Sequence, residues 1–204
     1  MTDAIQNTTL VYDIGDRRYI NLTNACTLKC SFCPKNQGSM QVHDFQLDMK
    51  KQPKASEVID ALGDLTDISE VVFCGYGEST LRLGPLIEIA AYVKWQGIPV
   101  RVNTDGLANL VHGRNVLPEM AKVVDALSIS LNAQNETVYN RHCLPSKKGA
   151  YQALLEFIRA APLYIEKVEV SAIDGLEGVD IEACRRIVEN AGAQFKRRVL
   201  DEVG

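Results

Sequence analysis

The sequence predicts an α/β protein that folds as a partial (β/α)6 barrel of the TIM type with an N-terminal β-hairpin arm. From residue 53 onward, short apolar runs alternate with segments whose apolar residues recur at helical spacing. This alternation favours parallel strands joined by right-handed crossovers. The chain has 204 residues, and a complete eight-fold barrel needs roughly 250, so six strands in an open barrel are expected. If only the alternation of strands and helices is considered, a flat, doubly wound sheet is an equally consistent alternative.

The hairpin arm is expected from two β-prone runs, residues 10–12 and 18–22, which flank an Asp/Gly turn at residues 13–16. The second run leads directly into a cysteine-rich stretch, residues 26–33. Residues 34–52 have weak periodicity and many polar side chains, so a long functional loop is expected there. This loop is also the candidate cover for a substrate.

Cap and stop signals bound the helices that follow. Ser56 can cap the first helix, and Gly97 follows the second. Pro162 stops the fourth, whereas Asp180 and Gly192 bound the fifth. The apolar stripes of the five expected helices lie within residues 58–65, 86–93, 116–124, 154–161 and 181–188. The expected strands between and after them are residues 70–74, 100–104, 126–131, 168–173 and 195–200.

The composition is that of an ordinary globular chain, with 46% hydrophobic and 24% charged residues. One domain, residues 1–204, is expected. No apolar run approaches the roughly 18 residues of a membrane span, and the polar start Met1–Asn7 does not resemble a signal peptide. A cytoplasmic location without a membrane partner is therefore expected. The net charge of −4 disfavours a long nucleic acid as the default partner.

The stretch Cys26-Thr27-Leu28-Lys29-Cys30-Ser31-Phe32-Cys33 places three thiols in one short loop. Thiolates are soft ligands that suit iron–sulfur clusters or zinc. A cubane cluster has four irons, so three cysteines leave one iron open to a substrate or cosubstrate. A zinc site formed by these cysteines and His43 is an alternative, although neither a second C-x2-C pair nor an H-x3-5-H half is present. Three clustered cysteines cannot pair evenly in disulfides.

Polar and glycine-rich residues recur where the expected strands end, which is where barrel folds gather their sites. Gly75-Tyr76-Gly77-Glu78 follows the second parallel strand, and its glycines let the backbone approach a ligand closely. Asn103-Thr104-Asp105-Gly106 and Ser130-Leu131-Asn132 follow the next two strands. Each of these could instead cap a helix.

The cysteine loop closely resembles that of the radical S-adenosylmethionine (SAM) enzymes, and the glycine-rich turn resembles their Gly-Gly-Glu motif with Tyr76 in the middle place. Cys33-Pro34-Lys35-Asn36, the stretch 73–78, the stretch 103–114 and Ser130-Leu131-Asn132-Ala133-Gln134 look like the small TatD-associated radical SAM proteins. The resemblance covers nearly the whole chain. It implies a [4Fe-4S] cluster on Cys26, Cys30 and Cys33. It implies SAM binding by Phe32, Gly75, Tyr76, Gly77, Glu78, Asn103, Thr104, Ser130, Asn132, Ile173 and Leu176.

The remaining polar residues near the strand ends are candidates for binding the substrate, and their chemistry indicates its class. Amides read nucleobase edges, and arginine binds carboxylate or phosphate in a fork. The candidates are Asp105, Asn109, His112, Arg114, Gln134 and Arg141. A turn network is the alternative for residues 105–115.

The predicted function is reductive cleavage of SAM to a 5′-deoxyadenosyl radical, which takes hydrogen from a small, anionic, possibly nucleotide-like substrate. The alternatives are a glycyl-radical activase acting on a partner protein, a non-catalytic iron–sulfur and SAM-binding protein, and an electron-transfer protein. A reductant such as flavodoxin or ferredoxin is expected. The resemblance also suggests a TatD-type hydrolase partner.

Overall fold

The computed structural model describes residues 8–200, which form an α/β fold with a mostly parallel seven-stranded sheet. The polar stretch Met1–Asn7, used above to predict that no signal peptide is present, lies outside these residues. The strands of the sheet are β1 (Val11–Ile14), β2 (Arg17–Ile20), β5 (Glu70–Phe73), β6 (Val100–Thr104), β7 (Ala126–Ser130), β8 (Lys167–Asp174) and β9 (Gln194–Val199). They lie side by side in that order.

Strand β1 runs antiparallel to β2, and each later strand is parallel to the one before it. This is the arrangement expected when each strand is connected to the next through a helical crossover. Seven α-helices are described: α1 (Ala55–Leu62), α2 (Leu83–Trp95), α3 (Ala108–His112), α4 (Leu117–Met120), α5 (Glu136–Cys143), α6 (Ala150–Ala160) and α7 (Ile181–Asn190). Short 3-10 helices are η1 (Pro34–Gln37), η2 (Ser79–Arg82) and η3 (Ala161–Leu163).

The core lies between one face of the sheet and the helices. Side chains alternate in direction along a strand, so in β6 the buried Val100 and Val102 alternate with the half-buried Arg101 and Asn103. The apolar members pack with helix residues in one cluster that includes Phe73, Ile129, Val170, Leu86, Val93, Leu154, Phe157 and Val188. The opposite face of the sheet keeps polar side chains.

The sequence correctly indicated strands and helices from residue 55 onward, but three stretches differ. Residues 34–52 are not one long loop, because they contain η1 and a small hairpin of β3 (Gln41–Val42) and β4 (Phe45–Gln46). The helix expected over 116–124 is the single turn α4, and α3 forms within the expected loop 105–115. Helix α5 was not predicted, because its few apolar residues alternate with polar ones, although Asn135 caps its first turn.

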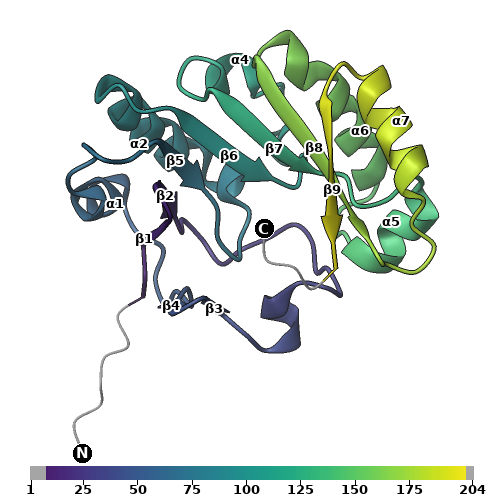
Figure 1. The fold of residues 1–204 in the computed structure, drawn as a ribbon, viewed down its shortest axis with the longest axis horizontal. Helices are drawn as coiled ribbons and strands as arrows, with labels where there is room; N and C mark the ends of the chain where they lie inside the picture. The colour runs from purple at the N-terminus through teal and green to yellow at the C-terminus, as the bar shows by residue number, and fades with distance from the viewer. Residues whose placement is uncertain (1–7, 201–204) are drawn as a thin grey trace, which may run out of the picture.

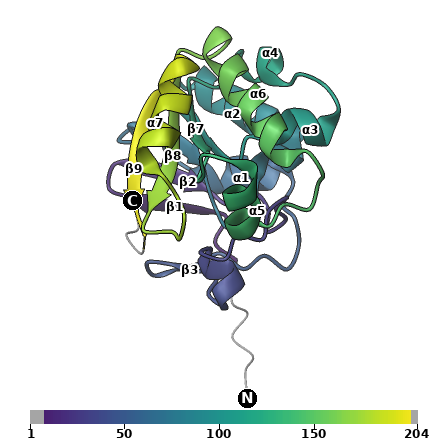
Figure 2. The same cartoon turned by 90° about the vertical axis from the view of Figure 1, so that its right-hand side faces the viewer.

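In both views the β3–β4 hairpin lies at the opposite end of the molecule from α4 (Figures 1 and 2). Helix α4 precedes β7, so it marks the amino ends of the strands. The hairpin therefore lies towards their carboxyl ends. Within residues 8–200, no helix is both long and apolar enough to span a membrane.

Candidate functional site

The predicted site segments leave the sheet at the carboxyl ends of neighbouring strands. The cysteine loop follows β2, the glycine-rich turn follows β5, and Asp105 follows β6. Asn132 and Leu176 follow β7 and β8. Because these strands are parallel and adjacent, the five segments share one edge of the sheet, where ligands of such folds bind.

The end of α5 holds the cysteine loop in place. The amide of Lys29 donates to the carbonyl of Cys143 at 3.0 Å, and the amide of Ser31 donates to the carbonyl of His142 at 2.9 Å. These two bonds flank Cys30 and place its thiol beside the Cys143 thiol. Interaction with the Cys143 thiol, followed by burial, raises the pKa of the Cys30 thiol in the metal-free protein. Binding of a metal centre at Cys30 must therefore release a proton.

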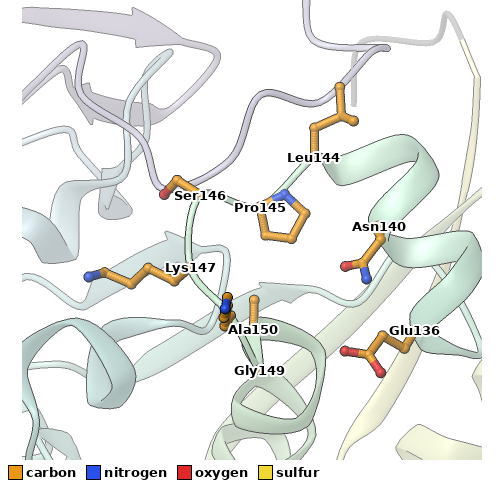
Figure 3. Close-up of a pocket in the computed structure, with 9 residues that line it drawn as sticks. Glu136, Asn140, Leu144, Pro145, Ser146, Lys147, Gly149 and Ala150 are labelled. Carbon is orange, nitrogen blue, oxygen red and sulfur yellow. The ribbon is translucent and has the colours of Figure 1, made fainter.

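The loop after α5 contacts the cysteine loop on a second side. Both the amide and the hydroxyl of Ser146 donate to the carbonyl of Thr27, each at 2.9 Å. Ser146 also lines an open depression of about 540 Å³ beside the cysteine loop (Figure 3). Its other lining residues are Glu136, Asn140, Leu144, Pro145, Lys147, Lys148, Gly149 and Ala150. None of them was predicted as a site residue.

The three thiols differ in exposure: Cys26 is exposed, whereas Cys30 and Cys33 are half-buried. In the described part of the chain, no three Cys, His, Asp or Glu side chains converge as ligands of a single ion. A zinc site needs such convergence. A cubane spreads its cysteines over different irons, so these thiols need not converge on one ion to hold a cluster. The alternative zinc site with His43 stays a prediction.

The glycine-rich turn packs directly on the stem of the cysteine loop. A Cβ added to Gly77 would lie 1.9 Å from the carbonyl oxygen of Thr23, and one on Gly75 would lie 2.6 Å from Oδ1 of Asn21. The amide of Glu78 donates to the carbonyl of Ala25 at 2.8 Å. Only glycine permits so close a backbone approach at Gly77, so the turn and the loop form one unit.

The carboxylate of Glu78 is buried and bound on both oxygens. One oxygen accepts from the amide and hydroxyl of Thr80, at 3.0 and 2.7 Å, and from the hydroxyl of Thr104, at 3.0 Å. The other accepts from the amide of Asp105 at 2.7 Å. Glu78 thus ties the end of β6 to the glycine-rich turn, and its carboxylate orients the motif's backbone.

Asp105 joins the same network to the cysteine loop. Its carboxylate accepts from the hydroxyl of Thr27 and, at 3.0 Å, from the amide of Leu107. Burial, together with the nearby Glu78 carboxylate, raises the pKa of Asp105 well above its ordinary value. Asp105 was predicted to contact substrate, but its described contacts are with the protein's own loops.

Asn132 combines two unusual features. Its backbone has a φ of +62°, in the left-handed region that non-glycine residues rarely occupy. Its side chain is 3% exposed, and the amide nitrogen donates to the sulfur of Cys143 at 3.8 Å. Its amide oxygen is buried with no hydrogen-bond partner among residues 8–200. Such an orphaned acceptor is costly and suits a ligand that brings a donor.

The other predicted SAM contacts lie on or just beyond the same strand ends. Phe32 packs against the core, and Ile173 is buried near the end of β8. Ser130 pairs in register with Ser171 of the neighbouring strand. Leu176 lies in the turn after β8, where its carbonyl accepts from the amide of Val179.

The predicted substrate residues in and just after α3 contact nearby parts of the chain. Asn109 accepts from the amide of Val116 at 2.9 Å, and His112 Nε2 lies 2.8 Å from the carbonyl of Thr80. Arg114 pairs with Glu119 at 2.5 Å. The residues after β7 behave similarly. Gln134 contacts Gly178 and Asp180, and Arg141 lies 3.5 Å from Glu177 in an exposed pair.

Sequence reasoning missed a cationic group on the polar face of the sheet. Cys74 neighbours Asn103, Arg101 and Arg198, whose polar and charged groups favour its thiolate, although burial raises the pKa of its thiol overall. Arg101 also donates to Asn103 at 3.0 Å and pairs with Glu70 at 3.0 Å. Arg198 is half-buried and has no ion-pair partner within residues 8–200. The alternation of polar residues within β6 was the signal that could have indicated this face.

Comparison with known proteins places the chain in a family. Residues 20–191 match the Radical SAM superfamily. A protein of Methanocaldococcus jannaschii, provisionally described as a glycyl-radical enzyme activating enzyme, is 32% identical over 81 residues. That alignment covers 40% of this chain and 30% of the relative, so most of the relative lies outside it.

Solved structures share the fold. A structure of TYW1 with a bound lysine–pyruvate adduct has a TM-score of 0.67 at 16% identity, covering 92% of this chain and 66% of that one. SuiB of Streptococcus suis bound to SAM has a TM-score of 0.66 at 15% identity, covering 91% and 40%. This chain is therefore shorter than either protein. Since the family match spans most of the sequence and the cysteine loop lies within it, the chain belongs to the radical SAM superfamily, whose enzymes use a [4Fe-4S] cluster and SAM.

Proposed function

We propose that Cys26, Cys30 and Cys33 hold the [4Fe-4S] cluster and that SAM binds beside it against residues 75–78 and Asn132. When bound, the cluster supplies the electron that cleaves SAM to methionine and a 5′-deoxyadenosyl radical, which takes a hydrogen atom from the substrate. The single observation that carries this proposal is the orphaned amide oxygen of Asn132, buried at the strand edge next to Cys143.

In this proposal each predicted segment contributes a different contact. The backbone of the glycine-rich turn provides carbonyl acceptors for the amino group of SAM, and Glu78 holds that backbone through its bonds to Thr80 and Asp105. Asn103 and Ser130 provide short polar groups for the ribose and carboxylate, whereas the hydroxyl of the predicted Thr104 is already bound to Glu78. Phe32, Ile173 and Leu176 provide apolar surface for adenine.

The substrate we propose is a small anion that binds on the polar face of the sheet. Arg101 and Arg198 form a cationic group around Cys74, the residue that directly precedes the glycine-rich turn. Guanidinium groups bind carboxylate or phosphate bidentately. Asn109, His112 and Gln134 are engaged in loop contacts, and Arg141 is half-exposed beside Glu177, so Arg141 remains a candidate for a further contact with the anion.

A glycyl-radical activase that acts on a partner protein is the second candidate. The description of the Methanocaldococcus jannaschii relative favours it. Under either candidate, we propose a cytoplasmic protein that receives electrons from flavodoxin or ferredoxin. A TatD-type hydrolase partner is a prediction from the sequence resemblance alone.

The test is anaerobic reconstitution followed by chemical reduction and measurement of 5′-deoxyadenosine. The wild-type protein should hold about four irons and four sulfides per chain and form 5′-deoxyadenosine from SAM. Cys26→Ala, Cys30→Ala and Cys33→Ala should each lose the cluster, whereas Cys184→Ala, a buried cysteine on α7, should keep it. A protein that binds zinc instead of iron would refute the proposal.

The same assay separates the two substrate classes. Pooled nucleotides and small organic acids should increase 5′-deoxyadenosine formation if the substrate is a small anion, and Arg198→Gln should reduce that increase. Stimulation only by a glycyl-radical enzyme would instead establish the activase. The matched control for Arg198→Gln is Arg197→Gln, because Arg197 pairs with Asp174 outside the group around Cys74.

A further inference from the structure

Cys143 is a buried cysteine that lies outside the C-x3-C-x2-C motif but contacts it. It is the last residue of α5 and is 0% exposed. The two backbone hydrogen bonds from Lys29 and Ser31 bring this helix end against Cys30, so that the Cys143 thiol neighbours the Cys30 thiol. The contact between the two sulfurs is therefore fixed by the main chain on both sides.

The direction of a hydrogen bond between these neighbouring thiols follows from the chemistry of a metal ligand. In the metal-free protein, either thiol can carry the shared proton. Once Cys30 binds an iron, its sulfur is deprotonated, so only the S–H of Cys143 can donate. Asn132 supports this direction, because its amide nitrogen donates to the Cys143 sulfur and so occupies it as an acceptor.

Asn132 itself keeps a strained backbone, with φ at +62°, which a glycine would adopt without cost. Asparagine is among the non-glycine residues that adopt this conformation most readily, and its side chain is buried. One end of its amide contacts Cys143, and the other end is the orphaned oxygen. Asn132 thus contacts the Cys143 thiol and can hold its orientation.

We propose that Cys143 is a positioning residue that raises the reduction potential of the cluster by donating an S–H···S hydrogen bond to Cys30. The inference rests on the proposed function, because it requires the cluster on Cys30. A hydrogen bond to a ligand sulfur withdraws electron density from it and stabilises the reduced, more negative cluster. The bond therefore makes the cluster easier to reduce.

The test is an anaerobic redox titration of the reconstituted protein without SAM, followed by electron paramagnetic resonance. Cys143→Ala removes the donor and should shift the midpoint potential to a more negative value. Cys143→Ser has nearly the same side-chain volume as Ala but keeps a donor, so its potential should lie closer to wild type. Iron and sulfide content is measured for every variant.

Two control variants separate the hydrogen bond from general packing. Tyr139→Phe removes a buried hydroxyl one helical turn before Cys143 that has no partner in the described structure. Cys184→Ala removes an equally buried thiol on α7. Both should keep the wild-type potential, because neither group bonds to Cys30.

An unchanged potential in Cys143→Ala with a full cluster would overturn the inference, and so would an equal shift in Tyr139→Phe. Loss of the cluster from both the Ala and Ser variants would also overturn it. That result would show that Cys143 supports the cluster through the packing of its side chain and not through a hydrogen bond. A new electron paramagnetic resonance signal in Cys143→Ala, indicating one fewer sulfur ligand, would make Cys143 a ligand instead. Failure of the wild-type protein to assemble any cluster would refute the proposed function separately.

Discussion

At the scale of single residues, Glu78 is the most connected polar group of the site. Its carboxylate accepts four hydrogen bonds from Thr80, Thr104 and Asp105 while 4% exposed. Removing it leaves buried donors unpaired, each at a cost of about 1–3 kcal/mol. Relief of its repulsion with Asp105 offsets part of this cost.

We therefore expect Glu78→Ala to lower the free energy of unfolding by about 2 kcal/mol or more and to weaken SAM binding. Urea denaturation of the metal-free protein measures the first effect, and titration of the reconstituted protein with SAM measures the second. Glu166→Ala, at an exposed position, is the control and should change neither. A Glu78→Ala protein as stable as wild type would show that the network does not support the turn.

Asn132 allows the ligand contact to be tested without backbone strain. Because its φ is +62°, Asn132→Gly keeps the conformation and removes only the side chain. The loss of one buried hydrogen bond, about 1.4 kcal/mol, should reduce SAM affinity roughly tenfold. Iron content should stay at the wild-type level, and equilibrium binding of SAM that matches wild type would remove Asn132 from the proposed site.

At the scale of elements, the close contact between the glycine-rich turn and the cysteine loop can be tested with two glycines. A methyl group on Gly77 would lie 1.9 Å from the backbone oxygen of Thr23, whereas one on Gly84 in α2 meets nothing within 4 Å. We expect Gly77→Ala to be poorly folded or to lose its cluster. Gly84→Ala should raise the free energy of unfolding by about 0.5–1 kcal/mol through its higher helix propensity.

Thermal unfolding and iron content measure both changes. If Gly77→Ala retains wild-type stability and a full cluster, the turn and the loop are independent units and the close contact between them is not required. Gly84→Ala controls for the general effect of adding a methyl group to a glycine of this chain.

At the scale of the whole molecule, Asp105 links the loop after β6 to the cysteine loop and gives stability a pH dependence. Its pKa in the folded protein is raised above the ordinary 3.8, so the folded state binds its proton more tightly than the unfolded state. Its contribution to stability is fully present below about pH 4 and is lost as pH rises through the folded pKa.

Asp105→Asn removes this titration while keeping an acceptor for the amide of Leu107. The variant should therefore gain stability relative to wild type as pH rises from about 4 to 8. Urea denaturation of the metal-free proteins across this range measures the difference. If the difference in unfolding free energy does not change with pH, Asp105 does not have a raised pKa.

The same scale shows what the sequence can predict. Strands such as β5 and β6 were predicted because apolar, β-branched runs are local signals, and α6 and α7 because their apolar stripes are regular. The cysteine spacing indicated the cofactor because it is also local. Helix α5 gave no such signal.

The contacts that complete the site could not be predicted, because they join residues far apart in the chain. Glu78 meets Asp105 across two strands, and Cys30 meets Cys143 through a helix that the sequence did not reveal. Among the predicted substrate residues, Arg114 pairs with the nearby Glu119, and whether these residues bind a substrate stays a prediction. Whether residues 75–78 and Asn132 bind SAM stays a prediction.

The central claim is that three cysteines leave one iron of the cluster open to SAM. The most direct measurement is electron–nuclear double resonance of the reduced cluster with SAM carrying ¹⁵N in its amino group. The account predicts a ¹⁵N coupling strong enough to require nitrogen bonded to iron, present in wild type and in Cys184→Ala. A reduced cluster whose spectrum does not respond to saturating SAM, or responds without any ¹⁵N coupling, would contradict it.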